Sequence, residues 1–378
     1  MRPTVGMTAT ARFSGVRIAV VRETSPGEAR VALVPEVVSK LTRVGYEVAV
    51  QSGAGAAALF DDAAYAAVGA HVVDSPLEGA GLILSVQPLV AADLAQLDGG
   101  AATLSFYPRQ SADLQLRTER GITTFGMEHV PRISRAQAMD ALSSQSLVAG
   151  YRAAVVAAGR LRQFFPLNMT AAGTVPPAQV VVLGAGVAGL QAIATCRRLG
   201  AVVKGYDVRA AAAEEIRSMG AVAIELDLPT LEGAGGYARE MTEERSRLQR
   251  ELLAPYIAAA DALITTAAVP GRQAPLLVTA EMIGRMKPGS VVVDLAAESG
   301  GNVEGVVPGS VVTIGGAQVW GGANVPSQMP GPASRLYATN VVNVVLLMTR
   351  ENQFAPDFDD EIVAAMRVNP PGEGGGAP

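Results

Sequence analysis

The chain is poor in the residues that build disulfide frameworks and zinc sites. It has one cysteine, Cys196, and two histidines, His71 and His129, which lie far apart without ligand spacing. A single cysteine excludes a disulfide scaffold and a cysteine-based metal site. Two isolated histidines do not favour zinc. We therefore expect no metal site, and we expect His71 and Cys196 to belong to the core.

Positive charge and long apolar runs are also scarce. Lys and Arg number 30 against 35 Asp and Glu, for a net charge of -5, and no basic stripe favours nucleic acid as a partner. The longest strongly apolar runs, such as Val341 to Met348, fall far short of the roughly 18 residues of a membrane span. The first 22 residues contain no signal-peptide core. We therefore expect a cytoplasmic chain with no membrane span of its own.

The length of 378 residues exceeds one ordinary core and predicts two domains. Apolar strands alternate with helical segments from residue 17 onward, which predicts α/β units with mostly parallel sheets. We predict one long helix over 134–165 and a Gly/Pro-rich connector over 170–177. The first domain is predicted over residues 1–142 plus 334–378, with a returning helix, and the second over 143–333. Residues 1–15 and 369–378 are expected to be disordered.

A glycine-rich turn carries the strongest local signal. The strand Val180–Leu183 is followed by Gly184, Gly186 and Gly189, which open a helix over 187–199. Gly184 permits a tight turn, Gly186 lets a pyrophosphate approach the backbone, and Gly189 allows close packing of helix and strand. The helix N-terminus offers free N–H groups to the phosphates. The pattern predicts dinucleotide binding.

Asp207 bears on which dinucleotide is bound. It ends the next strand, 18 residues after Gly189 (207 − 189), near the position of the carboxylate that accepts from the adenosine ribose hydroxyls. A carboxylate there repels a 2′-phosphate, so NAD(H) is favoured over NADP(H). Arg209 argues in the other direction, and Asp207 could also be an ordinary turn residue.

A polar block over 131–145 permits two interpretations. Gln137, Asp140 and Ser143 are three residues apart and would share one face of a helix, which is consistent with a binding site. Alternatively, Ser134 and Gln137 have the spacing of a capping box, and the polar face would simply be solvated.

Two further features are ambiguous. Between residues 231 and 241, three glycines accompany Tyr237, which indicates either a mobile lid with Tyr237 at its tip or a plain surface loop. His129 precedes Pro131 at a predicted domain junction and could carry a proton, although a lone histidine is more often structural.

Taken together, these blocks resemble one family. The runs over 132–145, 167–177 and 235–241 are similar to the NAD(H)-binding alpha subunit of proton-translocating NAD(P) transhydrogenases, and the resemblance extends from about Val16 to Asn343. The runs over 23–33 and 287–294 resemble the wider superfamily shared with alanine dehydrogenase. The implied fold is α/β, with two Rossmann-like domains, parallel sheets and a nicotinamide cleft between them.

The resemblance implies a role for individual residues. The loop around the nicotinamide would contain Arg132, Gln137, Asp140 and Ser143, and Tyr237 would close over the bound cofactor. Further implied nucleotide contacts are Ser134, Arg135, Ser144, Gln145, Gly184, Gly186, Val187, Gly189, Asp207, Val208, Arg209, Gly236, Gln249 and Ala268.

The implied activity is direct hydride transfer between NADH and NADP⁺, coupled to inward proton flow. NADP(H) would be bound by a partner subunit, and the other partner would span the membrane. The chain would thus be peripheral to the inner or cell membrane, and a homodimer is expected. Such a reaction depends on positioning more than on acid–base groups, because hydride passes directly between two ring carbons.

Two alternatives remain. Alanine dehydrogenases place a substrate lysine where this chain has Val86 and a catalytic histidine near Tyr107–Pro108, and Glu298 replaces their catalytic Asp. Arg30 is retained, but an arginine can persist structurally. A dehydrogenase without its acid–base pair cannot handle the imine. The chain also departs from the transhydrogenase pattern itself, because Ser85 stands where relatives usually carry lysine, and this leaves the inner cleft of the first domain in doubt.

The second alternative is a non-catalytic NAD(H) sensor. A pure binder would not need to keep Arg132, Gln137 and Asp140, so their presence argues against it.

Overall fold

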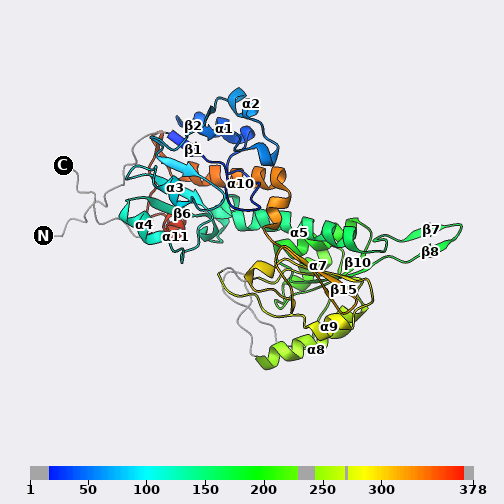
Figure 1. The fold of residues 1–378 in the computed structure, drawn as a ribbon. Helices are drawn as coiled ribbons and strands as arrows, with labels where there is room; N and C mark the ends of the chain where they lie inside the picture. Colours follow the sequence, from blue (N-terminus) through cyan, green and yellow to red (C-terminus); the bar gives the residue numbers. More distant parts are fainter. Residues whose placement is uncertain (1–16, 229–242, 269–270, 370–378) are drawn as a thin grey trace. The chain divides into compact units, whose positions relative to one another are not determined.

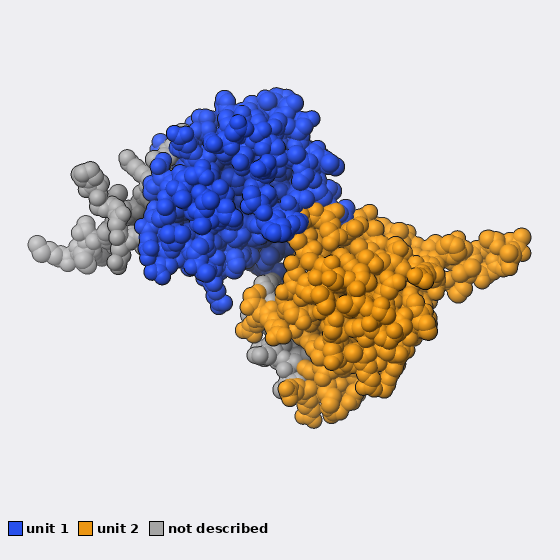
Figure 2. All heavy atoms as spheres, viewed as in Figure 1, with its two compact units in different colours: residues 1–145, 329–378 blue, residues 146–328 orange. Residues whose placement is uncertain are grey.

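The computed structural model describes residues 17–228, 243–268 and 271–369. The chain forms two compact units, which Figure 2 distinguishes by colour: residues 1–145 with 329–378, and residues 146–328. We call them unit 1 and unit 2. The first crossing between them lies inside helix α5 (Ala141–Arg160), and the second lies just before helix α10 (Pro330–Leu347).

Unit 1 is built on a six-stranded sheet in which every neighbouring pair is parallel. Its order is β3-β2-β1-β4-β5-β6, the doubly wound Rossmann arrangement. Strand β1 is buried from Ile18 to Val20, because strands covered on both faces are continuously apolar. The strands are β1 Arg17–Val20, β2 Glu47–Gln51, β3 His71–Val73, β4 Leu82–Leu84, β5 Ala102–Ser105 and β6 Thr123–Gly126.

Helices cover both faces of this sheet (Figure 1). Helix α10 enters the core with Tyr337, Val341 and Val345, each fully buried. Pro330 begins it, since the first helical position needs no N–H. The other helices of unit 1 are α1 Pro35–Thr42, α2 Asp62–Ala67, α3 Ala91–Leu94, α4 Leu114–Glu119 and α11 Glu361–Met366, with short 3₁₀ turns η1 Ala56–Ala58, η2 Met127–His129 and η3 Ser134–Met139.

Unit 2 repeats the arrangement with a seven-stranded sheet, ordered β11-β10-β9-β12-β13-β15-β14. All neighbours are parallel except the edge strand β14, which is antiparallel to β15. The strands are β9 Gln179–Leu183, β10 Val202–Tyr206, β11 Val222–Ala223, β12 Ala262–Thr265, β13 Val291–Asp294, β14 Val311–Ile314 and β15 Ala317–Gly321.

Side chains of β9 divide between two cores in unit 2. Val180 and Val182 pack with residues of α5 and of α6 (Val187–Arg198), whereas Val181 and Leu183 pack with residues of α8 (Glu243–Ala259) and α9 (Ala280–Gly284). This alternation follows from the two-residue period of a strand. Helix α7 (Ala212–Ser218) contributes Ile216 to the first of these cores. The predicted fold class, two Rossmann-like α/β domains, is thus confirmed, with β14 as the antiparallel exception.

Two local predictions were wrong. Residues 134–165 do not form one helix, because the 3₁₀ turn η3 ends at Met139 and α5 begins only after Asp140. The Gly/Pro-rich connector forms a β-hairpin, β7 (Asn168–Thr170) and β8 (Gly173–Val175), which extends outward from the body of unit 2 (Figure 1). Gly173 adopts φ +134° at its turn, a conformation that favours glycine.

Three single residues test the expected core and tail. Cys196 is fully buried, as predicted. His71 is exposed, contrary to expectation, because β3 is an edge strand. The expected disorder of Asn369 is wrong, because Asn369 is buried, accepts from Thr124 N at 2.9 Å and donates to Ile122 O at 2.7 Å beside β6. No helix among the described residues is long and apolar enough to cross a membrane.

Candidate functional site

The polar block of unit 1 forms a pocket. Its volume is about 320 Å³. Four residues predicted around a nicotinamide, Arg132, Gln137, Asp140 and Ser143, line it together with Pro131, Ile133, Ser134 and Ala136. The structure therefore brings these members of the predicted site together within one unit.

Asp140, which lines the pocket, is held in place because its side chain caps the N-terminus of helix α5. Its Oδ1 accepts from Ser143 N at 2.9 Å, and its Oδ2 accepts from Ser143 Oγ at 2.5 Å. The predicted capping box is wrong, since η3 has no side-chain cap at its start. A carboxylate at this N-cap also interacts favourably with the helix dipole.

Helix α10 fixes the 3₁₀ turn that precedes Asp140. Asn340 and Asn343 both donate to the carbonyl of Ala138 at 2.9 Å. Neither residue was predicted from the sequence. Their signal was available, because the two amides lie three residues apart in the apolar second half of the helix, and a buried polar group needs a partner.

Three predicted contacts of this block lie outside the pocket lining. Arg135 forms an ion pair with Asp360 at 2.7 Å and a second with Glu361 at 3.3 Å. Hydrogen bonds from Arg135 lower the pKa of Asp360. Ser144 donates to Ala141 O at 3.2 Å, and Gln145 is buried behind it.

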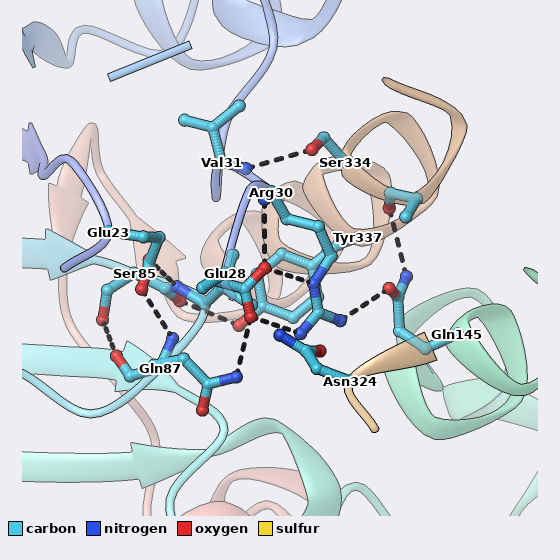
Figure 3. A network of polar contacts seen from close by, with 12 residues as sticks. Glu23, Glu28, Arg30, Val31, Ser85, Gln87, Gln145, Asn324, Ser334 and Tyr337 are labelled. Atoms are coloured by element: carbon cyan, nitrogen blue, oxygen red, sulfur yellow. Dashed lines mark hydrogen bonds and ion pairs between the residues drawn. The ribbon is translucent and has the colours of Figure 1, made fainter. Parts of the chain in front are cut away.

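A buried polar cluster lies beside Gln145 in unit 1 (Figure 3). Arg30 pairs with Glu28 at 2.6 Å and donates to Gln145 Oε1 at 2.8 Å. The pKa of Glu28 is lowered to about 2: burial acts to raise it, but the hydrogen bonds and charge of Arg30 outweigh burial. Glu23 accepts from Val86 N and Gln87 N, and burial raises its pKa to about 7. The resemblance of residues 23–33 to the wider superfamily did not predict this ion pair.

The glycine-rich turn of unit 2 has the expected geometry. Gly184 has φ +98°, and a Cβ on Gly189 would lie 1.8 Å from the carbonyl oxygen of Gly184. A Cβ on Gly186 would meet nothing within 4 Å, so open space lies over the backbone where a pyrophosphate would approach. Val187 begins α6 and is exposed.

Asp207 follows β10 and braces this turn. Its Oδ2 accepts from Ala185 N at 2.7 Å, and its Oδ1 accepts from the backbone N of Arg209 at 2.9 Å. The Arg209 guanidinium bonds to Asp207 and to Ala185 O, and the hydrogen bond to Asp207 raises the pKa of Arg209. Val208, between them, is partly buried.

The other predicted nucleotide contacts differ in exposure. Gln249 is buried on α8, and its Oε1 has no hydrogen-bond partner among the described residues. Ala268 is exposed, and the segment before it is held by Asn302, which bonds to both N and O of Ala267. The predicted lid with Gly236 and Tyr237 lies outside the described residues.

The two other side chains that could react, those of His129 and Cys196, are buried or partly buried. His129 Nε2 lies 3.1 Å from the carbonyl oxygen of Tyr107, and burial lowers the pKa of His129. Burial raises the pKa of the Cys196 thiol to about 12. No group of three or more His, Cys, Asp or Glu in the described ranges of the chain could hold a metal ion.

Comparison with known proteins agrees with a two-domain Rossmann-type protein. The family model "Alanine dehydrogenase/PNT, N-terminal domain" matches residues 19–149, and "Alanine dehydrogenase/PNT, C-terminal domain" matches residues 153–373. The chain therefore belongs to the alanine dehydrogenase/PNT family.

Individual relatives lie on both branches of this family. NAD(P) transhydrogenase subunit alpha of Haemophilus influenzae is 43% identical over 94% of this chain and 71% of its own length. The crystal structure of transhydrogenase from Sinorhizobium meliloti matches with a TM-score of 0.87 and 42% identity, over 94% of this chain and 99% of that one. Alanine dehydrogenase of Mycobacterium tuberculosis is 34% identical over 78% of this chain and 76% of its own length.

Proposed function

We propose that this chain is the NAD(H)-binding subunit of a proton-translocating NAD(P)⁺ transhydrogenase. The observation that carries the proposal is the pocket lined by Arg132, Gln137, Asp140 and Ser143. It occurs in a chain 43% identical to a protein named NAD(P) transhydrogenase subunit alpha. The reaction proposed is direct hydride transfer between NADH on this chain and NADP⁺ on a partner subunit.

The pocket suits a reaction that depends on positioning. Asp140 is fixed by its bonds to Ser143, and the turn before it is fixed by Asn340 and Asn343. Arg132 and Gln137 offer donors for a carboxamide and ribose hydroxyls, whereas Ser143 Oγ, whose proton goes to Asp140, offers an acceptor. Held groups of this kind orient the nicotinamide, and hydride transfer then needs no acid–base group of the protein.

NAD(H), rather than NADP(H), is the proposed cofactor of this chain. Phosphates would lie on the open backbone at Gly186 and the N-terminus of α6. Asp207 would accept from the ribose, and its negative charge would repel a 2′-phosphate. Arg209 does not reverse this preference, because its guanidinium is already paired with Asp207 and Ala185 O.

The partners proposed are a membrane-spanning subunit and an NADP(H)-binding subunit, with a second copy of the chain forming a homodimer. The name "subunit alpha" of the relative supports the need for partner chains. Hydride transfer would be coupled to proton movement across the membrane, and the chain would lie in the cytoplasm on the surface of the inner or cell membrane.

The alanine dehydrogenase relative favours a second candidate, an amino-acid dehydrogenase. The residues expected of an alanine dehydrogenase are poorly matched in this chain, since Val86 is apolar and fully buried where a substrate lysine is expected. All three guanidinium nitrogens of Arg30 also donate to Glu28 or Gln145, which leaves no guanidinium nitrogen without an internal acceptor. The transhydrogenase function is therefore the better supported one.

The test is hydride transfer from NADH to an NADP⁺ analogue, by the chain alone and after addition of a purified NADP(H)-binding transhydrogenase subunit. Turnover in the mixture but not with the chain alone is expected. No turnover, with NADH binding verified by fluorescence, would contradict the proposal and favour an NAD(H) sensor. Turnover of pyruvate with ammonium and NADH would favour the amino-acid dehydrogenase.

A further inference from the structure

The Glu28–Arg30 pair is the most deeply buried ion pair among the described residues of unit 1 and lies outside the pocket lining. The side chains of Arg30 and Glu28 are 4% and 0% exposed. Burying two charges is costly, and such a pair is weak evidence for stability by itself. A role for the pair must therefore be argued from the residues that it contacts.

The pair is geometrically fixed. Arg30 Nε and Nη2 donate to the two oxygens of Glu28 at 2.8 and 2.6 Å, a bidentate arrangement in which the planar guanidinium has one orientation. Gln87 Nε2 donates to Glu28 at 2.8 Å from the other side. The third guanidinium nitrogen, Nη1, donates to Gln145 Oε1 at 2.8 Å.

Gln145 transmits this fixed position to helix α5. Its Oε1 accepts from Arg30, and its Nε2 donates to Ala333 O at 3.1 Å and to Ser144 Oγ at 3.2 Å. The amide thus has a partner on each of its two atoms, and its rotamer is determined. Figure 3 shows the amide of Gln145 between Arg30 and helix α10.

Because of its position on α5, Gln145 connects the Arg30 contact to the residues that line the pocket. Gln145 lies two residues after Ser143, about 200° around the helix axis at 3.6 residues per turn. Ser143 and Asp140 line the pocket at the start of α5, and Gln145, which begins the second turn, is held on the opposite side of the helix. The start of α5 is therefore fixed from both faces.

We propose that Arg30, clamped by Glu28, is a positioning residue that acts through Gln145 to fix the first turn of α5 and thereby the orientation of Asp140 and Ser143 in the pocket. The effect on hydride transfer rests on the proposed function. The effect on the helix turn does not.

The test compares Arg30→Lys with Arg117→Lys. Arg117 is a matched control, because it is also fully buried in unit 1 and pairs with a carboxylate, Asp113, at 2.7 Å. Its other hydrogen bonds go to β5 and to the loop before α3 rather than to α5. Lysine cannot hold Glu28 bidentately and reach Gln145 at once. Measurements are kcat in the reconstituted mixture, Kd for NADH, Tm, and amide hydrogen exchange of residues 143–146.

Both variants are expected to lower Tm. Only Arg30→Lys should lower kcat, by about tenfold with Kd for NADH within about threefold, since small misplacements of positioned groups are costly. It should also speed exchange at 143–146. Gln145→Met should give the same kcat loss, and the double variant Arg30→Lys/Gln145→Met should be no slower than the worse single variant.

Opposite outcomes overturn the inference. If Arg30→Lys slows kcat and alters exchange no more than Arg117→Lys, or if the losses of the double variant multiply, Arg30 is merely structural and the proposed function stands. If the wild-type mixture does not turn over, the proposed function fails. Exchange at 143–146 then decides alone: faster exchange confined to this turn supports the positioning role, and unchanged exchange refutes it.

Discussion

The two units have the same strand order around their first strand but different turns after it. In unit 2, β9 leads into Gly184, Gly186 and Gly189, and the backbone at Gly186 faces open space. In unit 1, β1 leads into a polar segment that contains Glu23, Glu28 and Arg30, whose charged groups are turned inward and bonded to each other or to backbone N–H groups.

A doubly wound sheet therefore does not by itself make a nucleotide site. The topological switch point of such a sheet offers the place, but the residues of the turn decide what occupies it. Glycines leave the backbone accessible to a phosphate. In unit 1 the longer side chains fill the equivalent turn with an ion pair, which is hydrogen-bonded to helix α5 through Gln145.

The largest effect is expected for Gly189→Ala in the glycine-rich turn of unit 2. The new Cβ would lie 1.8 Å from Gly184 O, so α6 must move away from β9. We expect unfolding free energy to fall by about 3 kcal/mol and NADH binding to be lost, measured by denaturation and fluorescence titration. Gly159→Ala is the control, since Gly159 lies in α5 with nothing within 4 Å of the added Cβ. Retained NADH binding in Gly189→Ala would contradict the role of this turn.

A second test addresses the charged turn of unit 1. Burial raises the pKa of Glu23 from 4.5 to about 7. Below pH 4.5 the Glu23 carboxyl is neutral in both the folded and the unfolded protein, and its contribution to the free energy of unfolding is fully present. As the pH rises from 4.5 to 7, the unfolded state ionises first, and the free energy of unfolding falls by about 3 kcal/mol at 1.36 kcal/mol per pKa unit.

Glu23→Gln should remove this loss, so the Tm of the wild type should fall relative to the variant between pH 5 and pH 8. Glu119→Gln, at an exposed carboxylate of α4, is the control and should give a pH profile parallel to that of the wild type. A parallel profile for Glu23→Gln would show that Glu23 is ionised throughout this range.

Asp207→Asn sharpens the cofactor preference of unit 2. The variant removes the negative charge and weakens the hold on Arg209, which pairs with Asp207 at 3.0 Å. The ratio of Kd values for NADPH and NADH should fall by about tenfold or more, for a lost polar contact of about 1–3 kcal/mol. Adding Arg209→Gln should reverse some of that gain. An unchanged ratio in Asp207→Asn would mean that selectivity resides elsewhere.

Asp140→Asn has the smallest expected effect and separates positioning from folding. Asn also caps helices well, so α5 should remain folded while the charge in the pocket is lost. Hydride transfer in the reconstituted mixture should slow by at least about tenfold, or about 1.4 kcal/mol, with NADH binding within a few-fold. Asp61→Asn, at the N-cap of α2 where Asp61 accepts from Ala64 N at 2.7 Å, should leave the rate unchanged. An unchanged rate in Asp140→Asn would remove its assigned role.

The sequence predicted those elements of the fold that local patterns determine. The Gly184–Gly189 turn, the strand before it and Asp207 after the next strand follow from backbone requirements that few residues meet. Position 140 was harder, because a continuous helical pattern hides the break, and only the bonds of Asp140 to Ser143 make it an N-cap.

Contacts between distant segments could not be predicted. The bonds of Asn340 and Asn343 to Ala138 join residues about two hundred positions apart, and the Arg30–Gln145 bond joins residues 115 positions apart. A polar residue next to a strand signals that a partner exists but not which one. The location of the nicotinamide between the two domains stays a prediction.

The burial of Cys196 has a practical consequence. The single thiol of the chain is fully buried and held protonated, so maleimide reagents, which attack an accessible thiolate, should leave the native protein unmodified. A cysteine introduced at an exposed position, such as Met169→Cys on the hairpin, where Met169 is 73% exposed, would then be the one site of labelling. The wild-type chain is in effect already a cysteine-free background for spectroscopic probes.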